Sequence, residues 1–324
     1  MDYKKEEPLF VRGFYLELFS RLTAYFHKMF KNPSWFLMSL AGRFGIFRSM
    51  AVYLAKTPNL NNYQSKAHLS YFQNLDPKKA AEVLKKDALY PGIHLPNILF
   101  KEIVDFAYSN PCYGNLDPKL GFLYSEKETF EQKSNPFFTA QYFNTKQLCP
   151  TIQKLSNDPK LLEIAARYFS AEPIFTGSRL WWNFVVDDDI PYDSNKTITF
   201  FHYDLDDYAS LRFFFYLTDV GNEGGGHVMV LGSHIRKNFS HRFLPVKRRS
   251  DKDIFAYYGQ ENVTMVSGPA GFGFAEDLFC YHKATRPTQK DRLVLQIQFA
   301  VYDYGLHNDS IDPSFLSHIS YSNL

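Results

Sequence analysis

Cysteine is scarce in this sequence, which contains only Cys112, Cys149 and Cys280. An odd number of widely separated cysteines, with no CxxC pair among them, argues against a disulfide framework and against a structural zinc site. Such sparse use of cysteine is typical of proteins in a reducing compartment. We therefore expect a cytoplasmic protein.

Long apolar runs are also missing from the sequence. No segment approaches the roughly 18 uncharged residues that a membrane-spanning helix needs. The first residues of the chain do not lead into the apolar core of a signal peptide. We therefore expect neither an integral membrane protein nor a secreted one.

Neither sign of charge is in large excess, since 36 Lys and Arg residues stand against 34 Asp and Glu residues. The resulting formal net charge of +2 is too small to indicate a nucleic-acid partner, and we expect none. Hydrophobic residues at 45% are typical of a globular protein with an ordinary core. The 32 Phe and 22 Tyr residues indicate either an aromatic-lined cavity or a general compositional bias.

The chain divides by composition into an extension at residues 1–60 and a single larger domain at residues 61–324. Within the extension, residues 9–56 carry seven basic residues but only one acidic residue, Glu17, with many aromatic residues between them. Helices with basic and aromatic faces can lie in a membrane interface. They can equally pack on the main domain or on a second subunit, so all three interpretations stay open.

Helices are predicted between residues 65 and 170. Asp76 followed by Pro77 is a typical helix start, and Asn157-Asp158 followed by Pro159 repeats that pattern. The first of these helices should run to about Asp87 and the second to Phe169. Two further predicted helices begin near Asn97, which we expect to act as the cap, and at Lys146, and they end near Tyr108 and Leu155.

From about residue 173 to residue 304 the pattern changes to short runs rich in β-branched and aromatic residues. About eight such runs, separated by Gly- and Pro-containing turns, predict a β-sandwich or jelly roll. One of the runs spans residues 197–203 and the last spans 293–302. The expected fold is therefore a mostly β core, a double-stranded β-helix of the cupin type, buttressed by the preceding helices.

A candidate metal site begins with His202 and Asp204. Residues two apart on a strand project from the same face, so one imidazole and one carboxylate would point the same way. A second histidine would complete the 2-His-1-carboxylate set of non-haem Fe(II) oxygenases. His282 is our candidate, and His234 is the next, although it lies close to Asp204 in the sequence.

Polar residues follow one face of two predicted strands. Arg212, Phe214 and Tyr216 alternate with large apolar residues in the first strand, and Arg292 begins a similar alternation in the second. Buried polar groups are costly without partners. Arg292 is suited to hold a carboxylate through its two-pronged guanidinium group.

The segment from Arg179 to Tyr304 resembles the phytanoyl-CoA dioxygenase-like oxygenases, which depend on Fe(II) and 2-oxoglutarate. The resemblance lies in the order and spacing of six elements, which are His202-Tyr203-Asp204, Tyr216-Leu217-Thr218-Asp219-Val220, Leu231-Gly232-Ser233-His234, Gly268-Pro269-Ala270-Gly271, His282 and Arg292. The helices between Asp76 and Phe169 resemble the family only weakly. The family has a double-stranded β-helix core, in agreement with the strand pattern.

The resemblance implies that His202, Asp204 and His282 hold Fe(II) and that Arg292 binds the distal carboxylate of 2-oxoglutarate. It also implies a reaction with O2 in which 2-oxoglutarate becomes succinate and CO2. Tyr216 and Thr285 are further candidates for binding the cosubstrate. The chain departs from the family at Ala284 and Val294, where many members have a small hydroxyl residue. Because the family's halogenases lack the carboxylate, the presence of Asp204 favours hydroxylation.

The expected substrate is a small organic, lipid-like or carrier-linked molecule. Basic residues between positions 234 and 252 could meet an anionic group on it, or could be a solvated loop. Two other functions remain open. One is a cupin-like metal oxygenase that does not use 2-oxoglutarate, and the other is a ligand-binding barrel without catalytic activity.

Overall fold

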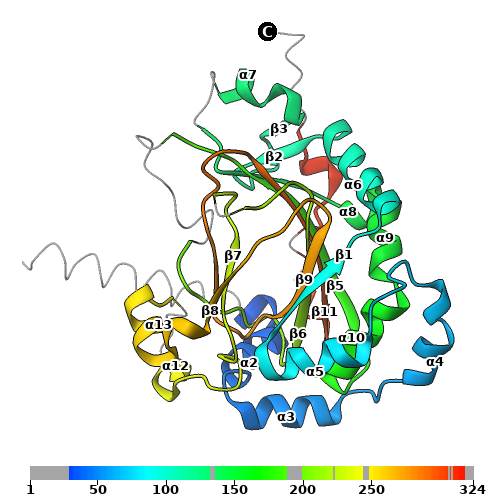
Figure 1. Ribbon diagram of the computed structural model, residues 1–324, viewed down its shortest axis with the longest axis vertical. Helices are drawn as coiled ribbons and strands as arrows, with labels where there is room; N and C mark the ends of the chain where they lie inside the picture. The colour runs from blue at the N-terminus through cyan, green and yellow to red at the C-terminus, as the bar shows by residue number, and fades with distance from the viewer. Residues whose placement is uncertain are drawn as a thin grey trace, which may run out of the picture.

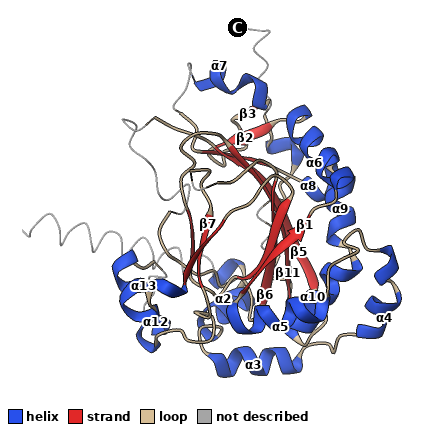
Figure 2. Ribbon diagram, viewed as in Figure 1, coloured by secondary structure: helices blue, strands red, loops and turns tan. Residues whose placement is uncertain are grey.

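The computed structural model describes residues 29–131, 136–187, 199–221, 223–243, 248–305, 307 and 309–317. Two antiparallel sheets form the centre of the molecule (Figure 1, Figure 2). The larger sheet contains, in spatial order, β1 (Leu89–His94), β9 (Phe272–Asp277), β6 (Ser210–Tyr216), β11 (Arg292–Ala300), β5 (Ile174–Asn183), β4 (Thr139–Tyr142), β2 (Cys112–Gly114) and β3 (Gly121–Phe122). The smaller sheet contains, again in spatial order, β10 (His282–Ala284), β7 (His227–Val230) and β8 (Val263–Val266). This is the jelly-roll arrangement that the sequence predicts.

Strand β11 lies in the middle of the larger sheet, between β5 and β6. Its residue Arg292 pairs with Asn183 of β5, and Gln296 pairs with Arg179. On its other side, Gln298 pairs with Arg212 of β6. Because side chains alternate along each strand, these polar residues share one face of the three strands.

Helices cover the other face of the larger sheet (Figure 1). They are α5 (Pro77–Asp87), α6 (Asn97–Ser109), α8 (Thr145–Leu148), α9 (Pro150–Ser156) and α10 (Pro159–Phe169). The predicted starts of α5 and α10 are confirmed, since Asp76 accepts hydrogen bonds from the backbone N–H groups of Lys78 and Lys79, and Asp158 does the same for α10.

Two of the predicted helix boundaries are wrong. Asn97 is the first residue of α6 rather than its cap, a position that Pro96 occupies without a side-chain hydrogen bond. The helix expected over residues 146–155 is divided between α8 and α9 at Cys149, which is extended. The residue before a proline is disfavoured in helical conformation, and Pro150 provides that break and then begins α9.

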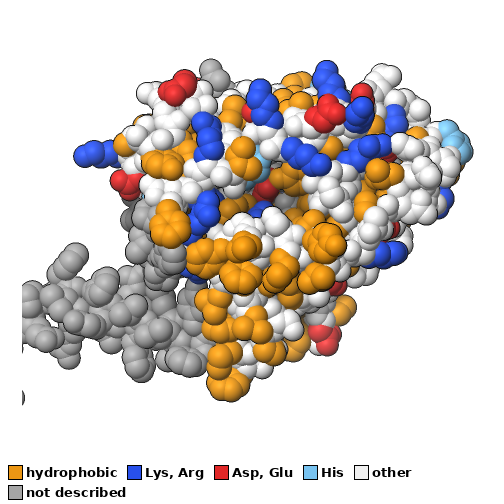
Figure 3. Space-filling model, turned by 90° about the horizontal axis from the view of Figure 1, so that it is seen from below, with side chains coloured by type: hydrophobic (Ala, Val, Ile, Leu, Met, Phe, Trp, Pro, Cys, Tyr) orange, Lys and Arg blue, Asp and Glu red, His pale blue; other side chains and the backbone are white. Residues whose placement is uncertain are grey.

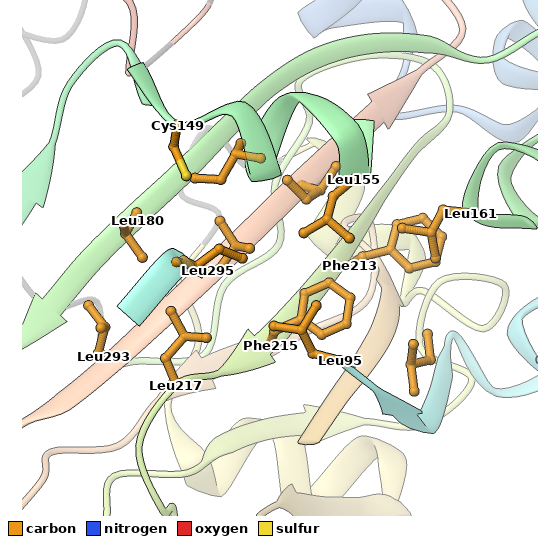
Figure 4. Close-up of a cluster of buried hydrophobic side chains, with 14 of the residues drawn as sticks. Leu95, Cys149, Leu155, Leu161, Leu180, Phe213, Phe215, Leu217, Leu293 and Leu295 are labelled. Atoms are coloured by element: carbon orange, nitrogen blue, oxygen red, sulfur yellow. The ribbon is translucent and has the colours of Figure 1, made fainter. Parts of the chain in front are cut away.

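The main hydrophobic core lies between these helices and the larger sheet (Figure 4). Leu293, Leu295 and Ile297 of β11 are fully buried in it, together with Phe213 and Phe215 of β6. The helices contribute apolar side chains such as Leu155 and Leu161, which Figure 4 shows facing the sheet. The face of these strands predicted to be apolar is therefore the one that builds the core.

The strands differ from the prediction in several places. The two runs expected near residues 174 and 180–186 form one strand, β5, and the strands β1 to β4 lie in the stretches between the predicted helices. Strands of two to six residues are too short to show a clear alternation. Of the run expected at 197–203, residues 197 and 198 lie outside the described residues. Phe201 and His202 form only isolated bridges, to Arg249 and His282.

The described part of the extension packs on the main domain. It forms α2 (Pro33–Ala41) and α3 (Gly45–Leu54), and Met38 of α2 is fully buried in a second apolar cluster, beside Tyr203 and Val230. The Tyr302 hydroxyl donates to the Ala51 carbonyl oxygen at 2.8 Å. Residues 9–28 of the predicted basic block lie outside the described residues. The division of the chain at residue 60 stays a prediction.

Two helices from the basic segment, α12 (Phe239–Phe243) and α13 (Asp251–Tyr258), lie beside the smaller sheet (Figure 1). The remaining short elements are α4 (Leu60–Ser65), α7 (Lys127–Glu131) and four 3₁₀ turns at Ala67–Leu69, Tyr124–Glu126, Gln260–Asn262 and Pro313–Phe315. Within the described ranges, no helix combines the length and the apolar character needed to cross a bilayer.

Candidate metal centre

The fold brings His202, Asp204 and His282 together. One ligand atom from each lies within 4.8 Å of the others. His202 Nε2 is 3.8 Å from Asp204 Oδ1, and His282 Nε2 is 3.8 Å from Asp204 Oδ2. Two imidazole nitrogens and a carboxylate that converge in this way form a set that can hold a divalent transition metal, Fe(II) among them.

Backbone hydrogen bonds position the three side chains. The N–H of His202 donates to the carbonyl oxygen of His282 at 3.0 Å, and the N–H of His282 donates back at 2.8 Å. The N–H of Asp204 donates to the Leu278 carbonyl oxygen at 2.9 Å. The intervening Tyr203 is fully buried in the second apolar cluster. His202 and Asp204 therefore point to the site and Tyr203 points into the apolar cluster, as in a strand, although the segment is not a regular strand.

The outer nitrogens of both histidines are fixed by carbonyl groups. His202 Nδ1 lies 3.1 Å from the Phe200 carbonyl oxygen, and His282 Nδ1 lies 3.0 Å from that of Cys280. Because a carbonyl oxygen only accepts, each Nδ1 carries the proton and each Nε2 presents a lone pair toward Asp204. Burial also lowers the pKa of both imidazoles, that of His282 to about 4, which favours the neutral form that binds metal.

Arg212 of β6 holds the carboxylate of the cluster. Its Nη1 donates to Asp204 Oδ2 at 2.7 Å, its Nη2 donates to Asp206 at 3.0 Å, and its Nε donates to Gln298 at 2.9 Å. Outer partners of this kind orient a ligand and tune its basicity. The sequence analysis places Arg212 on the polar face but does not indicate this role, because its two carboxylate partners come from the irregular turn after His202.

A cavity of about 250 Å³ opens beside the cluster. It lies between the two sheets, and its lining comes from β5, β6 and β11 on one side and from β7 and β10 on the other. The lining residues that the sequence placed on the polar faces are Arg212, Phe214, Tyr216, Arg292, Val294 and Gln296. The predicted polar faces of both strands therefore line this cavity.

Arg292 lies at one end of this cavity and is 5% exposed. Its Nη2 donates to Asn183 Oδ1 at 2.7 Å, and the same oxygen accepts from Trp181 Nε1 at 3.0 Å. A buried guanidinium group that faces the cavity from the first residue of β11 fits the binding of a carboxylate.

The two further candidates for cosubstrate binding have backbone partners. Tyr216 lines the cavity, but its hydroxyl donates to the Val266 carbonyl oxygen at 2.8 Å. Thr285 is not among the lining residues, and its hydroxyl donates to the Gly226 carbonyl oxygen at 2.8 Å. Each hydroxyl would have to turn away from its carbonyl to reach a ligand in the cavity.

The remaining histidines of the core segment differ in position. His234 faces the Lys85 carbonyl oxygen at 3.1 Å and does not line the cavity. His227 does line it, with its ring stacked 5.3 Å from that of His282 and its Nε2 2.6 Å from buried Glu276. Burial raises the pKa of Glu276, but the neighbouring His227 and His282 outweigh this effect and bring it to about 2. No pattern in the sequence indicates that His227 and Glu276 pair.

Comparison with known proteins gives only remote likenesses. No family model matches the chain, and no curated protein is similar to it. Solved structures that it resembles include the epimerase SnoN in complex with Fe3+, alpha ketoglutarate and nogalamycin RO, at 13% identity, a TM-score of 0.47 and coverage of 69% of this chain and 82% of that one.

Two further solved structures are similar at the same level. EctD from S. alaskensis with bound Fe shares 15% identity, with a TM-score of 0.47 and coverage of 76% of this chain and 86% of that one. The carbocyclase SnoK from nogalamycin biosynthesis shares 17% identity, with a TM-score of 0.45 and coverage of 70% and 84%. TM-scores below 0.5 carry no weight for the chemistry of this chain, and its resemblance to the phytanoyl-CoA dioxygenase-like family stays a prediction.

Proposed function

We propose that this protein is an oxygenase that depends on Fe(II) and 2-oxoglutarate and hydroxylates a C–H bond of a small organic substrate. The observation that carries the proposal is the convergence of His202, Asp204 and His282 on one cavity that has Arg292 at its end. Two neutral imidazoles and one carboxylate are the ligand set of non-haem Fe(II) oxygenases, and they leave coordination positions open for other ligands.

Bound together, Fe(II), 2-oxoglutarate and O2 supply an oxidant that can hydroxylate a C–H bond while 2-oxoglutarate is converted to succinate and CO2. The residues of this chain hold and orient these groups. His202 and His282 present Nε2 to the metal, and Arg212 keeps Asp204 aimed at it. Arg292 binds the distal carboxylate of 2-oxoglutarate through its guanidinium fork.

Tyr216 and Thr285 remain candidates for the same carboxylate, on condition that their hydroxyls leave the carbonyl groups of Val266 and Gly226. Ala284 and Val294 line the cavity where many family members place a hydroxyl residue. The anchoring of 2-oxoglutarate therefore depends mainly on Arg292 in this proposal.

The proposal is tested by the visible charge-transfer band of the Fe(II)–2-oxoglutarate chelate. The purified protein is kept anaerobic and titrated with Fe(II) and then with 2-oxoglutarate. We expect a band in the wild type, its loss in His202→Ala, and a need for far more 2-oxoglutarate in Arg292→Ala. Lys290→Ala is the matched control, since it removes an exposed positive charge two residues from Arg292.

The outcomes separate the three functions. A wild type that shows no band would contradict the oxygenase proposal. Tight Fe(II) binding without a response to 2-oxoglutarate would favour a cupin-like oxygenase that does not use this cosubstrate. A protein that binds neither would favour a ligand-binding barrel without catalytic activity.

The basic segment at residues 234–252 is proposed to contribute to the binding of an anionic substrate. Its described part contacts the segment that carries His202, because the N–H of Arg249 donates to the Phe201 carbonyl oxygen at 2.8 Å. The Arg248 guanidinium lies 3.9 Å above the centre of the Phe200 ring. Positive charge next to the segment that carries His202 supports this proposal.

We also propose a peripheral contact with an anionic membrane through residues 9–56. Figure 3 views the side of the molecule on which α2 and α3 lie, and hydrophobic side chains gather over part of this face. The large apolar residues exposed on these helices and just before them are Phe30, Leu37, Leu40, Ile46, Phe47, Met50, Tyr53 and Leu54. Contiguous exposed apolar side chains mark interaction surfaces, and the excess of basic residues in this block suits anionic lipid.

Co-sedimentation with vesicles of phosphatidylcholine and phosphatidylserine tests this contact on the full chain. We expect the wild type to bind these vesicles, and the triple substitution of Ile46, Met50 and Tyr53 by Ser to bind them less. The wild type should also bind less to vesicles of phosphatidylcholine alone, which are neutral. A protein that stays in the supernatant with both vesicle types would contradict the proposal. A concentration-dependent dimer that the triple substitution abolishes would assign the surface to a second copy instead.

The proposed location is the cytoplasm, at a membrane where the peripheral contact forms. Cys112, Cys149 and Cys280 are free and buried, which suits a reducing compartment. Fractionation of cells that express the protein would test it, and recovery from an oxidising compartment would contradict it.

A further inference from the structure

Arg179 lines the same cavity as Arg292. It projects from β5 into the cavity, on the same face as Trp181 and Asn183. Asn183 pairs with Arg292 across the sheet, and four residues of strand span roughly 13 Å. The two arginines therefore enter one cavity from positions well separated along the strands, and the metal ligands line the same cavity.

The contacts of Arg179 are weak for a cation in this position. Its Nη2 donates to Gln141 Oε1 at 3.4 Å, and its guanidinium lies 5.1 Å from the centre of the Trp181 ring. Its Nε is buried without a hydrogen-bond partner. Among the described residues, Arg179 forms no ion pair within 4.0 Å.

Arg212 provides a contrast within the same cavity. It bonds to the carboxylates of both Asp204 and Asp206, which offset its charge. Arg179 faces the neutral amide of Gln141 and pairs across the sheet with Gln296, another amide. Burial and the charge of Arg212 lower the pKa of Arg179 to about 10, although the more distant carboxylates of Asp204, Asp309 and Asp206 act in the opposite direction, and Arg179 is still a cation at neutral pH. A half-buried cation with no carboxylate within ion-pair distance is costly, and an anionic ligand that reached it would offset that cost.

We propose that Arg179 is a second anion-binding subsite, which takes the carboxylate or phosphate group of the substrate while Arg292 takes 2-oxoglutarate. The inference rests on the proposed oxygenase function in naming this ligand a substrate. The planar fork of Arg179 suits either oxyanion, and the Trp181 ring beside it offers an apolar surface to the carbon skeleton. A cavity of about 250 Å³ fits a small acid, oriented with its anionic end on Arg179 and a C–H group toward the metal ligands.

Binding of small probes to the metal-free protein tests the subsite without any catalytic readout. The probes are benzoate, phenyl phosphate and benzyl alcohol, which share a ring and differ in charge, and binding is followed by calorimetry. We expect the wild type to bind at least one of the two anions more tightly than the alcohol, and the tighter anion identifies the group. Arg179→Gln should weaken binding of that anion by about ten-fold or more and leave the alcohol unchanged, because a charged hydrogen bond is lost.

Two further variants keep the result interpretable. Lys154→Gln removes an exposed positive charge from α9, outside the cavity, and should bind the probes as the wild type does. Arg179→Lys keeps the charge without the fork and should give intermediate affinity. If Arg179→Gln does not fold, the lysine variant takes its place in the comparison.

Several outcomes would overturn the inference. One is equal anion affinity in the wild type and in Arg179→Gln, and another is no preference for either anion over the alcohol. A third is competition between the anion and 2-oxoglutarate in the Fe(II)-loaded protein, which would make Arg179 part of the cosubstrate site. A missing charge-transfer band would end the oxygenase proposal but would not alter the metal-free measurement, so the two failures are distinguishable.

Discussion

The two faces of β5, β6 and β11 carry opposite kinds of residue. The face toward the helices holds Leu295, Ile297 and Phe213, which are completely buried among other apolar side chains. The face toward the cavity holds three arginines, Gln296 and several aromatic rings. Adjacent residues of a single strand thus belong to different environments, because side chains alternate along it.

The two faces of these strands therefore have different roles, since the helix face stabilises the fold and the cavity face is suited to bind ligands. Apolar side chains on the helix face stabilise the fold through their burial. Because they are densely packed, substitutions that change their volume are poorly tolerated. Arginines on the cavity face lower stability unless a carboxylate or a ligand offsets their charge. A shift of one residue in register would exchange the two sets, so the alternation fixes the register of the sheet.

The largest expected effect on stability comes from truncating a buried side chain on the face toward the helices, called the core face below. Leu295→Ala should lower the free energy of unfolding by roughly 2–5 kcal/mol, because it removes buried methyl groups and leaves a cavity. Gln296→Ala, at the next position but on the cavity face, should lower it by less than about 1 kcal/mol. Urea denaturation of the metal-free proteins measures both. Equal losses at the two positions would contradict the separation of the faces.

A second prediction concerns the cavity face and is measured as a change in metal affinity. Arg212→Gln should weaken metal binding by about 10- to 100-fold, since Asp204 loses the partner that orients it. The affinity is measured by competition with a chelator under anaerobic conditions. Arg167→Gln, which breaks an ion pair with Glu163 on α10, is the control and should bind metal as the wild type does. Unchanged affinity in Arg212→Gln would show that Asp204 needs no such partner.

Lys237 is a buried basic residue that does not line the cavity. Its Nζ lies 3.9 Å from the centre of the Tyr203 ring and 3.8 Å from that of the Tyr281 ring. Burial lowers its pKa well below the usual value, so the unfolded chain binds more protons than the folded one between the lowered pKa and the ordinary one.

We therefore expect Lys237→Met to raise the free energy of unfolding by about 1 kcal/mol at pH 7. The wild type should gain stability as the pH rises toward the ordinary lysine pKa of roughly 10.4, so that the gap between the proteins closes. Denaturation curves between pH 7 and pH 10 measure this. A gap that is constant over that range would mean that Lys237 stays charged when it is buried.

The smallest effect is expected on the outward face of α3. Ile46 and Tyr53 are 75% and 86% exposed, so Ile46→Ser and Tyr53→Ser should each change the free energy of unfolding by no more than about 0.5 kcal/mol. These residues are as apolar as the core face but take no part in it. The same urea experiment decides the point, and a loss close to that of Leu295→Ala would place them in a buried interface.

Much of the central sheet could be predicted from the sequence because its strands are long enough to alternate. The seven residues of β6 and the nine of β11 distinguish their two faces clearly, and this placed Arg212 and Arg292 toward a cavity. The caps of α5 and α10 were predictable for a similar reason, since Asp followed by Pro is a local signal.

Other features depend on contacts between distant segments and leave no local pattern. The strands β2 and β3 are three and two residues long, and pairing with neighbours defines them. The bond between Arg212 and Asp204 requires the turn after His202 to fold back along β6. The weak partners of Arg179 are visible only when its surroundings are known.

The paired backbone of His202 and His282 has a consequence for the newly made chain. Each residue donates its N–H to the other's carbonyl oxygen, so neither imidazole is in place until the second segment has arrived. A ribosome-bound chain that ends before residue 282 holds only two of the three donors. If the proposed function is right, binding of a metal by all three donors requires residue 282, and by that point the helices and most of the larger sheet have been made.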